Sequence, residues 1–226
     1  MAELVERLSD VEGVEWIRLH YGYPMGFPWD VLRVMREREN VCRYLDIALQ
    51  HCSDHVLGLM RRGVTKRETV DMVRRIREEV PGIALRTTLM VGHPGETRED
   101  FEELMEFTRE MKFERLGVFA YSHEEGTYCD AHYRDDVSAR VKRGRVERLM
   151  ECQREVSAER NAALVGMRTR VLVDRQEGEF YVGRTEFDSP EVDPEVLVQS
   201  GKALRVGEFY DVRVTGAEDY DLYGEC

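Results

Sequence analysis

The chain has 226 residues, 42% hydrophobic and 35% charged, enough to bury the core of one large domain or of one medium and one small domain. Its 45 acidic residues outnumber its 33 basic ones, which gives a formal charge of −12. This balance argues against a general electrostatic grip on nucleic acid, because phosphate binding requires a basic surface. The composition also excludes collagen and disorder. Membrane insertion and secretion are not expected, because the sequence has neither a bilayer-spanning apolar run nor a signal-peptide pattern.

The cysteines are few and scattered, and none forms a CxxC pair. An odd, dispersed set is unlike the disulfide framework of a secreted protein, and it provides no ligands for a zinc ribbon. We therefore expect a reducing, cytoplasmic location and no metal site in this chain, with most of the thiols serving as buried packing residues. The cysteines concerned are Cys42, Cys52, Cys129, Cys152 and Cys226.

Strand and helix periodicities alternate through residues 1–136, which we assign to one α/β domain. After a short helix over 2–8, strands are predicted over 15–21, 43–49, 83–91 and 116–121, with helices over 28–39, 54–62, 66–80 and 97–111. Thr65 and Glu68 form a capping box at the start of one of these helices. Such repetition predicts a parallel sheet with right-handed crossovers. Four strands are too few to close a barrel, so we expect a partial parallel (β/α) barrel and a chain that begins inside a domain.

A long polar helix follows, and we assign residues 137–162 to it as a connector. From residue 163 the pattern changes to five short alternating runs separated by Gly, Pro and Asp. Short strands at this spacing predict a small all-β barrel of the OB type over residues 163–226.

A histidine lies at the carboxyl end of each predicted parallel strand, where ligands bind in such sheets. Imidazole is a common zinc ligand, so one interpretation is a metallohydrolase centre. The alternative is a set of hydrogen-bonded structural residues, which the absence of an HxH pair favours. The histidines concerned are His20, His51, His93 and His123.

Two strand ends have residues suited to ligand binding. In RTTLMVGHPGET, residues 86–97, glycines allow close backbone approach and a helix N-terminus follows, although an ordinary turn capped by Thr97 has the same pattern. In LDIALQHCSD, residues 45–54, Ser53 or Asp54 can cap the next helix. Capping does not account for Gln50, whose neutral amide suits a hydrogen bond to a ribose or an amino acid group.

Several blocks together resemble the radical S-adenosylmethionine methylthiotransferases, and within that family the RimO branch. Members of this branch add a methylthio group to the β-carbon of an aspartate in small-subunit ribosomal protein twelve. The resemblance extends over residues 10–226. Its blocks are WIRLHYGYP, RYLDIALQHCSD, MRRGVTKRETV, ALRTTLMVGHPGET, RLGVFAYSHEEGT and GRTEFDSPEVD.

The resemblance implies a partial radical SAM barrel followed by a TRAM domain, the small β-barrel predicted above. It also implies S-adenosylmethionine as cofactor. The residues that it places at this cofactor are Gln50, Ser53, Arg86 and Thr87, the turn residues Gly92, Pro94 and Gly95, and, near the adenine, Phe119, Tyr121 and Ser122.

The sequence departs from the family pattern in its cysteines. The family uses a CxxxCxxC triad to hold a 4Fe-4S cluster and an amino-terminal domain with a second cluster. Neither set of ligands occurs in this chain. We therefore expect the chain to correspond to the carboxyl-terminal half of the enzyme, without a catalytic residue of its own and inactive when alone.

The charge of the predicted barrel distinguishes between possible substrates. Residues 163–226 contain seven basic and fourteen acidic residues, a net charge of −7. An acidic barrel suits a basic protein such as a ribosomal protein better than tRNA, because complementary charge speeds encounter and excludes wrong partners. The residues expected to bind this partner are Glu186, Asp188, Glu191, Asp193 and Glu195. The alternatives are a tRNA methylthiotransferase of the same family and a non-catalytic binding module.

Overall fold

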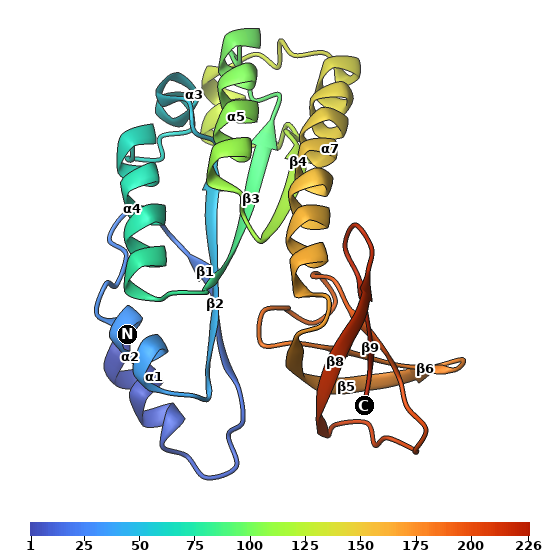
Figure 1. Ribbon diagram of the computed structural model, residues 1–226. Coiled ribbons are helices and arrows are strands. Elements are labelled where there is room, and N and C mark those ends of the chain that lie inside the picture. Colours follow the sequence, from blue (N-terminus) through green and yellow to red (C-terminus); the bar gives the residue numbers. More distant parts are fainter.

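The computed structural model describes residues 1–226, which form two lobes joined by one long helix (Figure 1). The first lobe is a sheet with helices packed on it, and the second is a small closed barrel. The first lobe contains α1 (Ala2–Ser9), β1 (Ile17–Gly22), α2 (Val31–Glu37), β2 (Val41–Gln50), α3 (Asp54–Leu59), α4 (Lys66–Glu79), β3 (Ala84–Val91), α5 (Arg98–Met111) and β4 (Arg115–Ala120). Each of these elements was predicted from the sequence, with small differences in its bounds.

The sheet of the first lobe has the order β1-β2-β3-β4, and every neighbouring pair is parallel. Strands that follow one another in chain order, each after a helical crossover, build the wall of a (β/α) barrel. Four strands leave that wall open. The predicted fold class, a partial parallel barrel followed by an all-β barrel, is confirmed.

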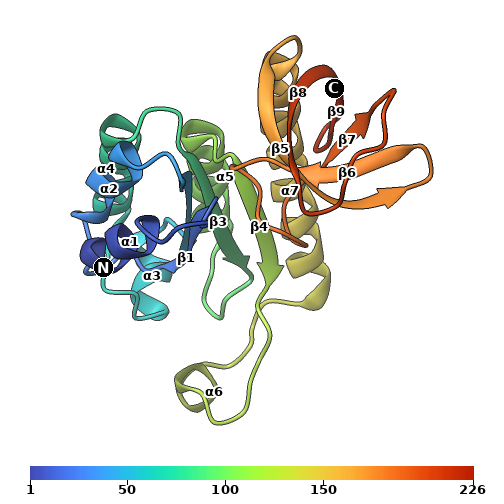
Figure 2. The same cartoon turned by 90° about the horizontal axis from the view of Figure 1, so that it is seen from below.

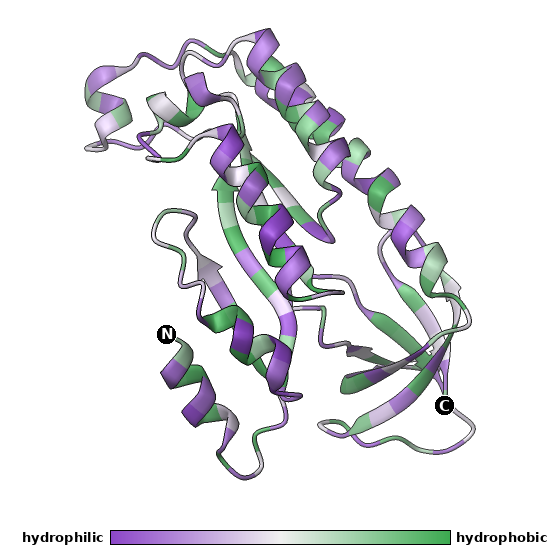
Figure 3. Ribbon diagram, turned by 60° about the vertical axis from the view of Figure 1, so that its left-hand side comes forward, coloured by the Kyte–Doolittle hydropathy of each residue, from purple (hydrophilic) through white to green (hydrophobic).

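Alternate residues of each strand face opposite sides of the sheet. One side packs against the helices in a core of 28 buried residues, to which β2 contributes Val41, Leu45, Ile47 and Leu49. Figure 3 shows hydrophobic segments, in green, along the strands of this sheet. The other side, here called the inner face, contains Arg18, His20, Tyr44, Asp46, Gln50, Arg86, Thr88, Met90, Arg115, Gly117 and Phe119.

Two helices of the first lobe begin with a capping box, which satisfies backbone donors that have no partner inside the helix. The predicted pair, Thr65 and Glu68, caps α4. A second pair, Thr97 and Asp100, caps α5 directly after the glycine turn. The turn and the helix start are therefore fixed together.

After β4 the chain forms a projecting segment that contains the short helix α6 (Tyr128–His132), seen away from the barrel in Figure 2. The sequence did not predict α6, because five residues are too few for a helical period to appear. The long helix α7 (Ala139–Leu164) then packs along β4 and α5 and leads to the second lobe. None of the helices is both long and apolar enough to cross a membrane.

The second lobe is a closed barrel with the strand order β5-β6-β7-β9-β8. The strands are β5 (Arg168–Glu177), β6 (Phe180–Arg184), β7 (Val196–Gln199), β8 (Phe209–Ala217) and β9 (Leu222–Glu225). Its core is small and consists of Val171, Val196, Val198, Val212, Val214 and Leu222. A Cβ atom at Gly183 would meet the carbonyl oxygen of Leu172, so glycine lets β6 lie close to β5 in this tight barrel.

A loop of the barrel, residues 185–195 and here called the acidic loop, lies on the inner face of the sheet. Asp188 bonds to Arg115 of β4, with 3.0 Å between Nε and Oδ1. Asp193 accepts a hydrogen bond of 2.8 Å from the hydroxyl of Tyr44 and one of 3.3 Å from Nε of Arg86. The carboxylates of Asp188 and Asp193 are 4% and 3% exposed. They join the two lobes.

This arrangement gives most of the five acidic residues expected to bind a basic partner other partners within the chain. Asp188 and Asp193 are buried in ion pairs within the chain, so they offer no free charge. Glu186 accepts a hydrogen bond of 3.0 Å from the backbone of Arg43, and Glu195 pairs with Arg175. Of the five acidic residues, Glu191 is exposed and forms no hydrogen bond or ion pair within the chain.

Candidate functional site

The end of β2 presents a polar side chain that is not used within the chain. Gln50, the last residue of the strand, has a φ of +70°, in the left-handed region that a non-glycine residue rarely adopts. This conformation turns the chain from the sheet toward α3. The Gln50 amide is half-buried and forms no hydrogen bond within the chain, so it can bond to a ligand.

The inner face is uncovered near the carboxyl ends of its strands. Gln50 of β2 lies beside Leu89 of β3, and Met90 of β3 lies beside Phe119 of β4. The Phe119 side chain is 59% exposed, which is unusual for a large aromatic residue in a sheet. A free amide and an open aromatic ring therefore flank the central strand, whereas the acidic loop covers the other half of this face.

Arg86 lies on the covered half of the inner face and links the sheet to the barrel. Its Nη1 is 3.3 Å from Oδ1 of Asp46, in addition to its bond to Asp193. Burial alone would lower the pKa of the Arg86 guanidinium, but these two carboxylates raise it above its usual value. Thr87 lies on the opposite face and donates a hydrogen bond of 2.8 Å to the carbonyl of Ile47. The structure therefore does not bring Arg86 and Thr87 together.

Ser53 is placed at the start of α3, where its hydroxyl accepts the backbone N–H of Val56. The same hydroxyl donates to the carboxylate of Asp100, which also lies 2.9 Å from Nδ1 of His55. Burial would raise the pKa of Asp100, but hydrogen bonds from Ser53, His55 and Thr97 outweigh it and hold the pKa well below its usual range. Ser53 therefore acts within the chain, fixing α3 to the start of α5.

The glycine turn after β3 is closed by a carboxylate of the chain itself. Glu96, whose side chain is fully buried, accepts the backbone N–H groups of Gly92 and His93 and pairs with Arg145 of α7 at 2.8 Å. Burial raises the pKa of Glu96. Gly92 has a φ of +77°, and the side chain of Lys142 occupies the place of a Cβ atom there. The absence of a side chain at Gly92 leaves room for Lys142 and so lets α7 pack against the turn.

The rest of the turn is also bonded internally. The backbone N–H of Gly95 donates to Oδ1 of Asp136 at 2.9 Å, and the buried Pro94 accepts at its carbonyl from the ring of His93. The amides that the sequence suggested for a ligand anion are thus occupied by carboxylates of this chain. The turn shapes the strand-end edge of the sheet and does not itself form an anion site.

The residues that follow β4 differ in their surroundings. Tyr121 is buried, with its hydroxyl 3.2 Å from Nδ1 of His123 and its carbonyl bonded to Lys142. Ser122 is exposed and donates to Glu124 at 2.7 Å. Among the three residues predicted near the adenine, Phe119 alone presents its side chain on the open inner face.

The four strand-end histidines do not form a metal centre. His51 and His93 are buried, whereas His20 of β1 and His123, which follows β4, are exposed. No group of three or more His, Cys, Asp or Glu side chains in residues 1–226 is placed to hold a metal ion. The metallohydrolase interpretation therefore has no geometric support, and the residues present do not fit an iron–sulfur cluster.

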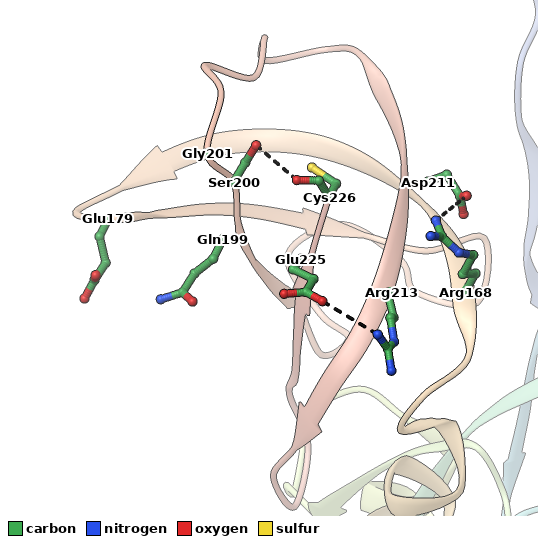
Figure 4. A pocket seen from close by; sticks show the side chains of 9 residues that line it. All are labelled: Arg168, Glu179, Gln199, Ser200, Gly201, Asp211, Arg213, Glu225 and Cys226. Carbon is green, nitrogen blue, oxygen red and sulfur yellow. Dashed lines mark hydrogen bonds and ion pairs between the residues drawn. The ribbon is translucent and has the colours of Figure 1, made fainter.

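The barrel has a polar pocket of about 660 Å³ on its surface, shown in Figure 4. Arg168 pairs there with Asp211 at 2.8 Å, and Arg213 lies 4.0 Å from Glu225. Glu179 extends from the turn between β5 and β6, and Gln199 extends from β7. Three carboxylates and two guanidinium groups give this pocket a net negative charge, and its acidic side chains, unlike those of Asp188 and Asp193, are at the surface.

Both lobes match known families. Residues 1–108 match the Radical SAM superfamily and residues 165–226 match the TRAM domain. The chain is 60% identical over 225 residues to the ribosomal protein uS12 methylthiotransferase RimO of Parabacteroides distasonis and 62% identical over 225 residues to that of Porphyromonas gingivalis. These alignments cover 100% and 99% of this chain and 52% of each relative.

Along its whole length the chain is similar to the radical SAM methylthiotransferases. It spans about half the length of the curated relatives that it matches. A solved structure described as coproporphyrinogen III oxidase (HemN) from Escherichia coli, a radical SAM enzyme, has a TM-score of 0.55 and 19% identity, over 70% of this chain and 38% of the other. At this identity the likeness concerns the fold alone.

Several residues that shape this candidate site were not predicted from the sequence. Asp46 holds Arg86, Glu96 closes the glycine turn, and Lys142 fills the space beside Gly92. Asp46 has a signal in the sequence, because a carboxylate within the apolar run RYLDIAL has to be buried beside a cation. Glu96 and Lys142 have none, since their partners are set by the packing of α7.

Proposed function

We propose that this chain provides the cofactor-binding half of the barrel and the TRAM domain of a methylthiotransferase that modifies the β-carbon of an aspartate in ribosomal protein uS12. The observation that carries the proposal is the match over nearly the whole chain to proteins named for that activity. Modification of a ribosomal protein also implies a cytoplasmic location. The open inner face supports the proposal independently, because it leaves the Gln50 amide and the Phe119 ring available at the end of the sheet where ligands bind in such folds.

The residues of the chain fit S-adenosylmethionine at this edge. We assign the Gln50 amide to a hydrogen bond with its polar groups and the exposed Phe119 ring to contact with its adenine. Arg86, whose charge is paired with Asp46 and Asp193, would support this edge from the covered half of the inner face. When it is bound and reduced in the complete enzyme, S-adenosylmethionine supplies the radical that such enzymes use. The residues of this chain bind and orient it.

The remaining assigned residues support the edge from behind. Ser53 fixes α3, Thr87 ties β3 to β2, and the turn through Gly92, Pro94 and Gly95 holds α7 against the sheet. We infer that these residues affect cofactor binding indirectly, because they hold the strand ends and helices that form the binding surface.

The charge of the barrel supports a basic protein as the partner. Its formal net charge is −7, and two of its carboxylates, in the acidic loop, form ion pairs with arginines of the sheet. The pocket that contains Glu179, Asp211 and Glu225 leaves acidic groups at the surface. We propose that this end of the barrel, with Glu191, attracts the basic ribosomal protein, and nothing in the barrel favours tRNA.

A chimera tests the proposed function. In the Parabacteroides distasonis relative, the part that aligns with this chain would be replaced by residues 1–226. The chimera, with its clusters loaded, would be incubated with S-adenosylmethionine and uS12. Mass spectrometry of uS12 is expected to show one methylthio group in place of one hydrogen on an aspartate.

Two matched variants sharpen this test. Gln50→Ala is expected to weaken S-adenosylmethionine binding by about tenfold, because one hydrogen bond in a partly buried site contributes about 1.4 kcal/mol. Glu191→Gln, at the surface of the barrel, should leave cofactor binding unchanged. A chimera that modifies tRNA and leaves uS12 unmodified would contradict the substrate proposed here.

A further inference from the structure

A cysteine and a histidine lie together above the strand ends, outside the surface assigned to the cofactor. The Sγ atom of Cys129, in α6, is 3.3 Å from Nε2 of His93. The other ring nitrogen of His93, Nδ1, is 2.9 Å from the carbonyl oxygen of Pro94. A carbonyl oxygen can only accept, so Nδ1 carries the proton and Nε2 is left to accept one from the thiol.

The surroundings keep the imidazole in place as a base. The His93 ring is 2% exposed and packs edge-on against the rings of Tyr121 and Tyr133, at centroid distances of 5.3 and 6.0 Å. Burial lowers the pKa of His93, which keeps the ring neutral at pH 7. A nucleophile within reach of a base, and a base oriented by a third group, is the arrangement that activates a thiol.

Only two of the five thiols are accessible. Cys42, Cys52 and Cys152 are buried, and burial raises the pKa of Cys42 to about 11. Cys226 is exposed and has no histidine beside it, whereas Cys129 is partly exposed. Cys129 is therefore the accessible thiol that has a base.

The position of the pair relates it to the cofactor edge. His93 lies in the glycine turn after β3, and Tyr121, whose ring packs against that of His93, directly follows β4. The thiol is thus held over the ends of the same two strands whose inner face carries Met90 and Phe119.

We propose that Cys129 accepts a sulfane sulfur atom from a small-molecule persulfide, with His93 as the base. This inference rests on the proposed function, because transfer of a methylthio group consumes a sulfur atom that has to be supplied.

The transfer balances without an added oxidant or reductant. The thiol of Cys129 gives its proton to Nε2 of His93, and the thiolate attacks the outer sulfur of a persulfide RS–SH. The S–S bond of the donor breaks and a new S–S bond forms on Cys129. The leaving thiolate takes the proton from His93, so the products are Cys129–S–SH and RSH.

The experiment uses the 226-residue chain and glutathione persulfide as the donor. After timed incubation, thiols and persulfides are trapped by alkylation, and peptide mass spectrometry gives the rate at each cysteine. In the folded chain, persulfide is expected at Cys129 at least about tenfold faster than at Cys226, since general bases contribute about 10²–10⁴-fold. In urea the two rates should become equal.

Two substitutions distinguish the effect of His93 as a base from the effect of solvent exposure on the rate of sulfur uptake. Cys129→Ser should abolish uptake at residue 129, and His93→Gln should slow it about tenfold or more while the rate at Cys226 stays the same. Equal rates at Cys129 and Cys226 in the folded chain would overturn the proposal. So would an unchanged rate in a folded His93→Gln chain. If that variant unfolds, the comparison of the folded and urea-treated wild-type chains decides.

Failure of this inference can be distinguished from failure of the proposed function. Sulfur uptake is measured without S-adenosylmethionine, clusters or uS12. A chimera that methylthiolates uS12 while the chain takes up no sulfur contradicts the sulfur proposal alone. Sulfur uptake by the chain with an inactive chimera contradicts the uS12 function alone. Full methylthiolation by a Cys129→Ser chimera would overturn the assignment of this thiol to sulfur supply.

Discussion

At the scale of single residues, Asp193 is a buried carboxylate that joins the two lobes. Its side chain is 3% exposed and bonds to both Arg86 and Tyr44. Removing one partner of a buried ion pair leaves the other charge uncompensated. We expect Asp193→Ala to lower the free energy of unfolding by about 3 kcal/mol, measured by urea denaturation.

The matched control for this prediction lies in the same loop. Glu191 is exposed and unpaired, so Glu191→Gln should change the free energy of unfolding by less than about 0.5 kcal/mol. Similar losses for Asp193→Ala and Glu191→Gln would mean that the loop is not held on the sheet as described.

His51 gives the chain a dependence on pH. It is fully buried, and burial lowers its pKa from 6.5 to about 3. Below pH 6.5 the unfolded chain therefore binds a proton at this residue that the folded chain does not bind. As the pH is lowered, the free energy of unfolding decreases by up to about 1.4 kcal/mol per pH unit. This loss ends near pH 3, where the folded chain also becomes protonated.

The test compares wild type with His51→Asn, whose side-chain oxygen can still accept the backbone N–H of Ser53. Between pH 6.5 and 5, urea denaturation is expected to show a steeper loss of stability in the wild type than in the variant. Parallel curves would show that His51 is protonated equally in both states. Because Nε2 of His51 has no hydrogen-bond partner, the variant removes an unsatisfied donor as well.

At the scale of elements, a glycine at the contact between α7 and the sheet and another inside α7 should respond to substitution in opposite directions. Gly92 has a positive φ and a Lys142 side chain where a Cβ would lie. Gly92→Ala should therefore destabilise the chain by at least about 2 kcal/mol. Gly144, inside α7, has open space around it, and Gly144→Ala should stabilise by about 0.5–1 kcal/mol. Thermal and urea unfolding measure both, and a stabilising Gly92→Ala would contradict the described packing of α7.

The elements themselves could be predicted because their signals are local. Short stretches of sequence are enough to indicate the capping box at Thr65, the strand over residues 84–91 and the long helix α7. What the glycine turn does could not be predicted. Its pattern fits a ligand-binding loop, but Glu96 and Arg145 fill it, and Arg145 comes from a helix 49 residues away in sequence.

At the scale of the whole molecule, Trp16 reports on how the lobes are joined. Its ring lies 4.7 Å from that of Phe209 in the barrel, whereas Trp29 packs within the first lobe against Phe27. In a Trp29→Phe background, Trp16 is the single tryptophan. Combined Asp188→Asn and Asp193→Asn substitutions should then shift its emission to longer wavelength, as water enters the junction.

The reciprocal background gives the control for that experiment. With Trp16→Phe and Trp29 retained, the same two substitutions should leave the emission unchanged, because Trp29 lies away from the barrel. A shift in both backgrounds would indicate general unfolding and would contradict a local opening of the junction.

The function of the acidic loop is the part of the site that the sequence could not reveal. A run of carboxylates suggests a solvated surface or a partner site, and the composition of the barrel agrees with either. The partners of Asp188 and Asp193 lie 73 and 107 residues earlier in the chain. Such long-range pairs are set by how two domains dock, and local periodicity contains no information about docking.

The junction has a consequence for how such proteins diversify. The arginines that bind the acidic loop lie on strands that also form the proposed cofactor face, so the two domains cannot be treated as interchangeable modules. A barrel from another protein, grafted onto this sheet, would leave Arg86 with one carboxylate and Arg115 with none unless its own loop supplied them. Recombination within the family should therefore succeed when the sheet arginines and the loop aspartates are inherited as one set.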